Sequence, residues 1–253
     1  MKRLLSLLAI TMAVVTLPAF AQSHVPVARG FASDLQTVPV MANVPGIGST
    51  FLSYLAILNP TASAYSVQVS LYDGNGVKHD ALISLAAGEQ KTYTNFLDAV
   101  FSGFVGGGAV TFKSPESAGG THNNRFIIDS EVRTSGTRFG TSVPALEFAG
   151  TSSRSFSPGV TVDSTARTNV GCFNQGDGAN TIKATVLDAT GKLTLGSVTL
   201  NLAANAWGQT AITTTVSGGM IQFDPSDSAV CYAVVVDNSS NDGRFVLATE
   251  YKP

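Results

Sequence analysis

The sequence predicts an all-β protein made of two tandem antiparallel β-sandwich domains that are related by internal duplication. The first observation is a period-two alternation of apolar and polar residues, as in Tyr65–Tyr72, which gives a strand one buried and one solvated face. The second is that the short apolar runs are separated by Gly, Asn, Asp and Pro, a spacing typical of sandwiches and barrels. The third is a repeat, because several segments return about 110 to 115 positions later in similar form. The paired segments are Phe51–Pro60 with Ala166–Gln175, Asp73–Gly76 with Asp188–Gly191, and Gly107–Phe112 with Gly218–Phe223.

The length of the repeat sets the predicted domain organisation. A single supersecondary repeat spans about 20–50 residues, so the repeated unit here is a whole domain. The expected parts are a signal peptide over residues 1–21, an N-terminal segment over 22–36, a first sandwich over 37–146 and a second over 147–253. For the N-terminal segment, both an ordered and a disordered state are left open.

The first 21 residues have the composition of a secretory signal. Lys2 and Arg3 form a basic start, residues 4–17 are apolar, and Ala19-Phe20-Ala21 fits a small-x-small cleavage site. The alternative is a membrane anchor, but the apolar run is shorter than the roughly 20 residues that a spanning helix needs. We therefore expect an exported, soluble protein with no transmembrane segment after signal cleavage, in the periplasm or at the cell exterior.

Strands are expected at matching places in the two halves. In the first half the series begins with Thr37–Asn43, and in the second half Ile182–Leu187 alternates as Tyr65–Tyr72 does. Phe112 and Phe223 are expected at equivalent core sites, each after a glycine pair that permits a sharp entry into the strand.

One short helix is expected, in the first half only. Residues 95–102 place Phe96, Ala99 and Val100 on one face, with Asn95 as N-cap and Gly103 as the stop. The matching stretch of the second half, residues 211–217, is rich in β-branched residues, which favour extended backbone.

Charge and composition exclude nucleic acid as a partner. The chain has 15 basic and 17 acidic residues, and loss of Lys2 and Arg3 with the signal peptide makes the mature chain more acidic. Neither half has the basic face that phosphate neutralisation requires.

The two cysteines, Cys172 and Cys231, both lie in the second half and are predicted to form a disulfide. An exported chain meets an oxidising compartment, and a bridge across about 60 residues is worth roughly 4 kcal/mol. The alternative is two buried free thiols. Ile57 matches Cys172 in the repeat, so the strand that carries the disulfide is expected to be an ordinary core strand in the first half.

Two residues are candidates for ligand binding. His122 lies in the polar segment Gly119–Asn124 and could act as a base or ligand, although loop histidines are usually solvated. Trp207 stands where the first half has Gln90, and an exposed indole could stack on a sugar ring. Its alternative is a core or interdomain position. With no phosphate loop, nucleophile elbow or zinc motif in the sequence, we predict no catalytic residues, no enzymatic activity and no cofactor.

Two acidic turns are candidate calcium sites. Asp73–Gly76 resembles the start of a calcium loop but lacks the later carboxylates, and Asp-Gly and Asn-Gly are preferred residues of tight hairpin turns. Asp237 and Asp242 bracket a stretch of hard oxygen ligands and are the better calcium candidates. An ordinary loop is the alternative there, and no metal is predicted.

Several motifs together resemble tandem immunoglobulin-like sandwich repeats of exported bacterial proteins, most of them uncharacterised. These motifs are Val38-Pro39-Val40, Asn43–Gly46, Leu55–Pro60, Tyr72–Gly76 and Leu85–Glu89. The second half departs from the pattern, because Asn174-Gln175 replaces Asn-Pro and residues 203–205 replace the glycine turn. The resemblance implies an immunoglobulin-like fold and an exported location. Periplasmic pilus chaperones share a two-domain architecture, but their paired basic anchor residues are not found here, and architecture alone does not transfer function.

The sequence therefore favours a non-enzymatic exported structural or interaction module, acting at a surface, in a matrix or in the periplasm on a protein or glycan partner. One alternative is a carbohydrate-binding module that uses Trp207 and strand tyrosines. Another is a pilus-chaperone-like periplasmic protein. A third is an enzyme with a site between the domains.

Overall fold

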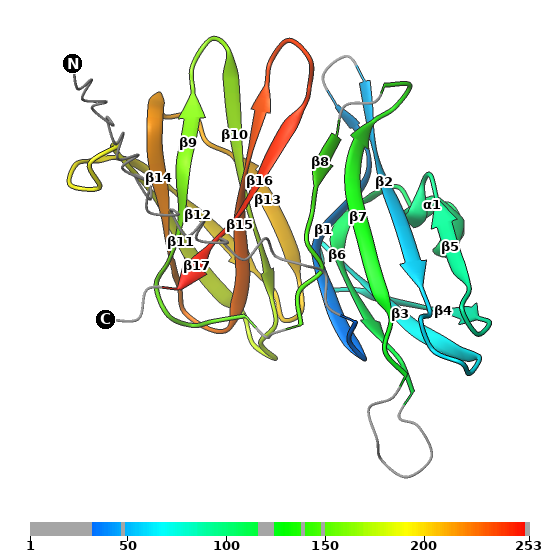
Figure 1. Ribbon diagram of the computed structural model, residues 1–253. Coiled ribbons are helices and arrows are strands. Elements are labelled where there is room, and N and C mark those ends of the chain that lie inside the picture. The colour runs from blue at the N-terminus through cyan, green and yellow to red at the C-terminus, as the bar shows by residue number, and fades with distance from the viewer. Residues whose placement is uncertain (1–31, 47–48, 116–123, 138–139, 148–149, 251–253) are drawn as a thin grey trace, which may run out of the picture.

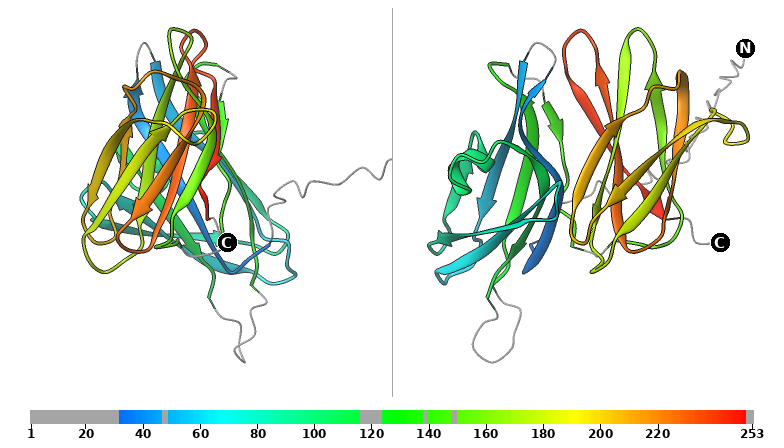
Figure 2. Two further views of the ribbon diagram at one scale, coloured as in Figure 1. Left: turned by 90° about the vertical axis from the view of Figure 1, so that its left-hand side faces the viewer. Right: turned by 180° about the vertical axis from the view of Figure 1, so that it is seen from behind.

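The computed structural model describes residues 32–46, 49–115, 124–137, 140–147 and 150–250. Antiparallel strands make up nearly all of the regular structure in these residues, in two groups that lie side by side (Figures 1 and 2). The predicted all-β class is therefore confirmed. The predicted signal peptide and residues 22–31 lie outside the described residues.

The first half is a single curled sheet of eight strands in the order β4-β3-β6-β1-β2-β7-β8, with β5 paired to β2. Strand β1 produces the curl. It pairs with β6 up to Asn43 and with β2 from Asn43 onward, and its register shifts between Val38 and Met41. One strand therefore serves both layers of the sandwich. The strands are β1 Leu35–Gly46, β2 Ser49–Leu58, β3 Tyr65–Asp73, β4 Lys78–Leu85, β5 Gln90–Tyr93, β6 Gly106–Lys113, β7 Ile127–Thr134 and β8 Gly140–Ser142.

The second half consists of two separate sheets, ordered β13-β10-β15-β16 and β12-β11-β14-β9-β17. The strands are β9 Ser155–Val162, β10 Ala166–Asn174, β11 Asn180–Leu187, β12 Thr194–Leu202, β13 Trp207–Ala211, β14 Val216–Pro225, β15 Ala229–Asp237, β16 Gly243–Leu247 and β17 Thr249–Glu250.

The two halves share one order of strand pairing. In each, the second strand pairs with the fifth and the seventh, the seventh with the eighth, and the third with the fourth and the sixth. The sixth strand also pairs with the first. The repeat seen in the sequence therefore coincides with a repeat of topology.

Each half encloses its own apolar core, because alternate residues of its strands point inward. Phe112 and Phe223 are both fully buried, in the first and second core respectively, as predicted. The predicted helix is also present, as α1 Phe96–Val100, and it buries Phe96 and Leu97. Its predicted N-cap, Asn95, makes no side-chain capping bond, whereas Gly103 follows the helix with φ +82° and donates its N–H to the carbonyl of Asp98.

The predicted disulfide between Cys172 and Cys231 is present. The two cysteines are directly opposite each other on the neighbouring strands β10 and β15, so the bridge lies within one sheet. At the corresponding place in the first half, Ile57 on β2 faces Ile128 on β7. All four side chains are buried, so packing in one half takes the place of a covalent bond in the other.

In each half, a buried asparagine at the end of the second strand binds both the loop that follows it and the loop after the fourth strand. The amide of Asn59 donates to the carbonyls of Ser63 and Ala86, each at 2.8 Å. That of Asn174 donates to the carbonyls of Gly178 and Ala203, at 2.8 and 2.7 Å. Both side chains are fully buried, so each amide needs these bonds to satisfy its own donors.

The chain before the first predicted strand is partly built into the fold. Strand β1 begins at Leu35, two residues before the predicted start, and the buried Gln36 side chain donates to the carbonyl of Phe126 at 2.8 Å. Within the described residues, no helix is long and apolar enough to cross a membrane.

Candidate functional site

The two halves pack through one face of the sheet β13-β10-β15-β16. On β15, Cys231 and Ala233 point into the second core, so Tyr232 points outward on the opposite face. Tyr232 is fully buried all the same, because it packs with the core of the first half. The outer face of this sheet is therefore an interdomain surface, and Figure 1 shows it facing β1 and β8.

Trp207 lies in this interface, the position that its interdomain alternative expects. The half-buried ring packs so closely on β6 that a Cβ at Gly107 would lie 2.8 Å from it. Its Nε1 donates to the Tyr232 hydroxyl at 3.0 Å, which in turn donates to Oε1 of Gln209 at 3.0 Å. Burial raises the pKa of Tyr232, so this hydroxyl stays protonated and able to donate. The indole is an interdomain contact, and the sugar-stacking role gains no support.

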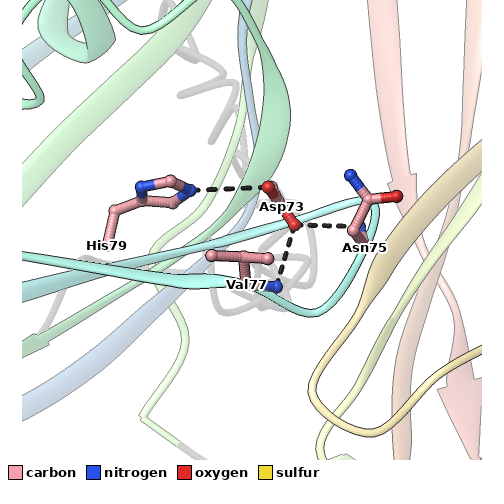
Figure 3. Close-up of polar contacts among 4 residues, drawn as sticks. All are labelled: Asp73, Asn75, Val77 and His79. Carbon is pink, nitrogen blue, oxygen red and sulfur yellow. Dashed lines mark hydrogen bonds and ion pairs between the residues drawn. The ribbon is translucent and has the colours of Figure 1, made fainter.

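The Asp73–Gly76 turn also docks on the second half. Gly76 has φ +76°, and a Cβ there would lie 2.5 Å from the carbonyl oxygen of Ala204. In Figure 3, one carboxylate oxygen of Asp73 accepts the backbone N–H groups of Asn75 and Val77, at 2.8 and 2.9 Å. The other oxygen lies 3.4 Å from Nε2 of His79. The carboxylate thus closes a tight hairpin turn, as the turn interpretation predicts.

Next to the Trp207 and Gly76 contacts, residues of both halves line a groove of about 380 Å³. It lies where the β1–β2 and β15–β16 hairpins end, at the top of Figure 1. Valines and Phe51 form most of its wall, and Arg167, Asn169, Gln209 and Asn241 supply its long polar side chains. Pockets of this size that combine an apolar wall with few polar groups are typical ligand sites. The apolar part of the wall consists of Val40, Ala42, Val44, Pro45, Gly46, Phe51, Val132, Val143, Ala211, Val234 and Val236.

Arg167 is the cationic side chain of the groove, and two asparagines hold it. Its guanidinium donates to Oδ1 of Asn238 at 3.1 Å and to Oδ1 of Asn241 at 2.8 Å. Asn241 has φ +60°, a backbone conformation that asparagine tolerates better than most residues. The β15–β16 turn therefore fixes the direction of the Arg167 side chain.

The predicted calcium candidates serve the same turn. Oδ1 of Asp237 accepts hydrogen bonds from the backbone and hydroxyl groups of both Ser239 and Ser240. These bonds hold the pKa of Asp237 well below its usual range. Oδ1 of Asp242 accepts from the N–H of Gly243. In the part of the chain that the structure describes, no three His, Cys, Asp or Glu side chains gather as metal ligands.

The other predicted ligand-binding residue, His122, lies outside the described residues. Sequence reasoning did not identify Arg167, Asn241 or the groove. The sequence did contain one signal. Arg167 and Asn169 stand where the first half has Leu52 and Tyr54, and such a change from apolar or aromatic to polar residues indicates that this face of the strand has different surroundings in the two halves.

Comparison with protein-family models gives no match for this chain, and comparison with curated proteins gives none either.

Proposed function

We propose that this protein is an exported, non-enzymatic binding module that holds a ligand in the groove between its two sandwiches. The observation that carries the proposal is the groove itself, an apolar cavity of about 380 Å³ with a few polar side chains in its wall. Sites between domains are common ligand sites, because two surfaces can enclose a ligand that one cannot.

Export is supported by the signal-like sequence of residues 1–21 and by the disulfide. Disulfides persist in oxidising compartments outside the cytosol. A periplasmic and an extracellular location both agree with these features.

The non-enzymatic part of the proposal rests on the composition of the groove. Its lining residues include no His, Cys, Asp, Glu or Ser, and its polar side chains are amides, one guanidinium and the Thr141 hydroxyl. Such groups orient a ligand by hydrogen bonding, whereas acid–base or nucleophilic catalysis needs an activated group within reach.

The duplication stays a prediction, and three features support it. The strand pairing repeats, the asparagines Asn59 and Asn174 close equivalent loops, and Asp73 and Asp188 cap equivalent turns. In this proposal one sandwich was copied, and the function arose where the copies meet.

The test uses the full mature protein and the neutral dye Nile red, whose fluorescence rises in apolar sites. Ala211 lines the groove, is an exposed residue and belongs to neither core, so Ala211→Trp is designed to fill the groove and leave both cores intact. Ala87, an exposed turn residue of the first half that does not line the groove, provides the matched control Ala87→Trp. We expect saturable dye binding that Ala211→Trp removes and Ala87→Trp retains. Equal binding by both variants, or no binding by the unsubstituted protein, would overturn the proposal.

A further inference from the structure

Arg167 brings an unneutralised positive charge to the groove. Among the described residues, no ion pair involves Arg167, and both of its hydrogen-bond partners are neutral amide oxygens. A guanidinium has five N–H donors, so two bonds to amides leave donors for a further acceptor.

The carboxylates at the neighbouring hairpin ends are engaged in their own turns. Asp237 and Asp242 accept bonds within the β15–β16 turn, and Asp163 accepts from the backbone of Thr165 and Ala166 in the β9–β10 turn. Each carboxylate is therefore oriented by its own turn, and none of the three forms an ion pair with Arg167.

The rest of the wall is suited to an apolar chain. Val40, Val44 and Phe51 come from the first half, and Val234 and Val236 come from the second. At about 30 Å³ for each water-sized group, a cavity of about 380 Å³ holds about a dozen such groups. That is the size of an unbranched chain of roughly ten carbons with its head group.

We propose that the groove binds a single-chain amphiphile with one carboxylate head, such as a medium-chain fatty acid, and that Arg167 binds the head. The planar guanidinium fork matches a carboxylate in geometry and charge, and the amides of Asn238 and Asn241 hold it in place. The apolar chain lies between the valines of the two halves, where it removes apolar surface from water. This inference rests on the proposed function and names the ligand class for the same groove.

The experiment measures how well three ten-carbon compounds displace Nile red from the mature protein. The compounds are decanoate, decan-1-ol and decylammonium, which share a chain and differ in head charge. We expect decanoate to displace the dye at a concentration about tenfold or more below that of decan-1-ol, because hydrogen bonds to charged groups are the stronger ones. Decylammonium should be the weakest of the three.

Two substitutions at Arg167 and one control connect the preference to this side chain. Arg167→Gln should remove the difference between decanoate and decan-1-ol, and Arg167→Lys should retain part of it. Arg154 is an exposed arginine of the second half that pairs with Asp224 and does not line the groove, so Arg154→Gln should leave the preference unchanged. Circular dichroism confirms that each variant is folded, and the lysine variant serves if the glutamine variant is not.

The outcomes separate this inference from the function on which it rests. Equal displacement by decanoate and decan-1-ol would overturn the role of Arg167 while groove binding stands. Groove-dependent dye binding that no ten-carbon compound displaces would overturn the ligand class. If Ala211→Trp also leaves dye binding unchanged, the proposed function fails as well.

Discussion

Removal of the disulfide should destabilise the second half by an amount that the structure allows us to calculate. The bridge joins Cys172 and Cys231 across a sequence separation of 59 residues. In the chain-entropy model, a loop of that length gives about 4 kcal/mol of stabilisation by restricting the unfolded chain. Both sulfurs lie in a packed core, so the substitute must fill space without introducing a polar group.

The suitable perturbation is the double substitution Cys172→Val and Cys231→Val. Valine is close to cysteine in size and apolar, and the corresponding pair in the first half, Ile57 and Ile128, shows that β-branched aliphatic residues fit opposite each other at this place. The expected loss in the free energy of unfolding is therefore close to the loop term, about 4 kcal/mol. For a domain of about 100 residues this corresponds to roughly 15–30 °C in Tm, and about half of that if the two halves unfold as one unit.

Differential scanning calorimetry measures the change in Tm, and guanidinium denaturation measures the change in the free energy of unfolding. Reduction of the unsubstituted protein should reproduce the loss, and the valine variant should not respond to reductant. A valine variant within about 1 kcal/mol of the unsubstituted protein would refute the calculation, and would mean that residual structure already restricts the unfolded chain.

Three further outcomes follow from hydrogen bonds and pKa shifts. Asn59→Ala and Asn174→Ala should each lower the free energy of unfolding, measured by urea denaturation, by about 2–4 kcal/mol. The reason is that each substitution removes four hydrogen bonds worth about 1 kcal/mol apiece, and a loss below about 1 kcal/mol would contradict it. The pKa of Asp237 is lowered in the folded state, so its charge stabilises the fold above the unfolded pKa of about 3.9 and ceases to as the pH falls through the folded value. Asp237→Asn keeps the acceptor oxygen but removes the charge. The difference in the free energy of unfolding between this variant and the unsubstituted protein should therefore disappear on acidification, and a difference that does not change with pH would exclude the charge as its cause. Burial raises the pKa of Tyr65 to about 12, so the contribution of its neutral hydroxyl to stability is complete below about pH 10 and is lost as the pH rises through about 12. Tyr65→Phe should therefore remove one tyrosine that ionises late in a pH titration followed by absorbance at 295 nm. An unchanged amplitude of the late phase would contradict the assignment.

The sequence predicted the strands and the tight turn, because both depend on residues close together in the chain. Period-two alternation identified strands such as Tyr65–Asp73, because an inward-facing side chain recurs at every second position wherever a strand covers a core. Asp73 and Gly76 identified a tight turn, because the carboxylate and the positive φ act within four residues. The predicted compartment and the even cysteine count were enough to pair Cys172 with Cys231.

The groove could not be predicted in the same way, because its walls come together only when the halves dock. Val44 and Val236 read as ordinary strand residues, and only the docked arrangement makes them neighbours across a cavity. Nothing in the sequence around Arg167 indicates its role, because its hydrogen-bond partners Asn238 and Asn241 lie 71 and 74 positions away. The contrast of Trp207 with Gln90 did indicate a difference in surroundings, but an indole suits both a sugar and a protein surface. The packing on Gly107 supports the protein surface.

The interdomain surface also has a consequence for assembly. A domain that docks on a similar domain through one face can in principle add further copies without end, as in open heterologous fibres. At the face of the first half that corresponds to the Trp207–Tyr232 surface, Gln90 and Asp129 occupy the places of the two aromatics, and both are exposed. An incoming copy would have to desolvate the Asp129 carboxylate where the second half offers the Tyr232 ring. The corresponding face of the first half therefore presents an exposed amide and an exposed carboxylate to solvent, where the second half presents two aromatic rings to its neighbour.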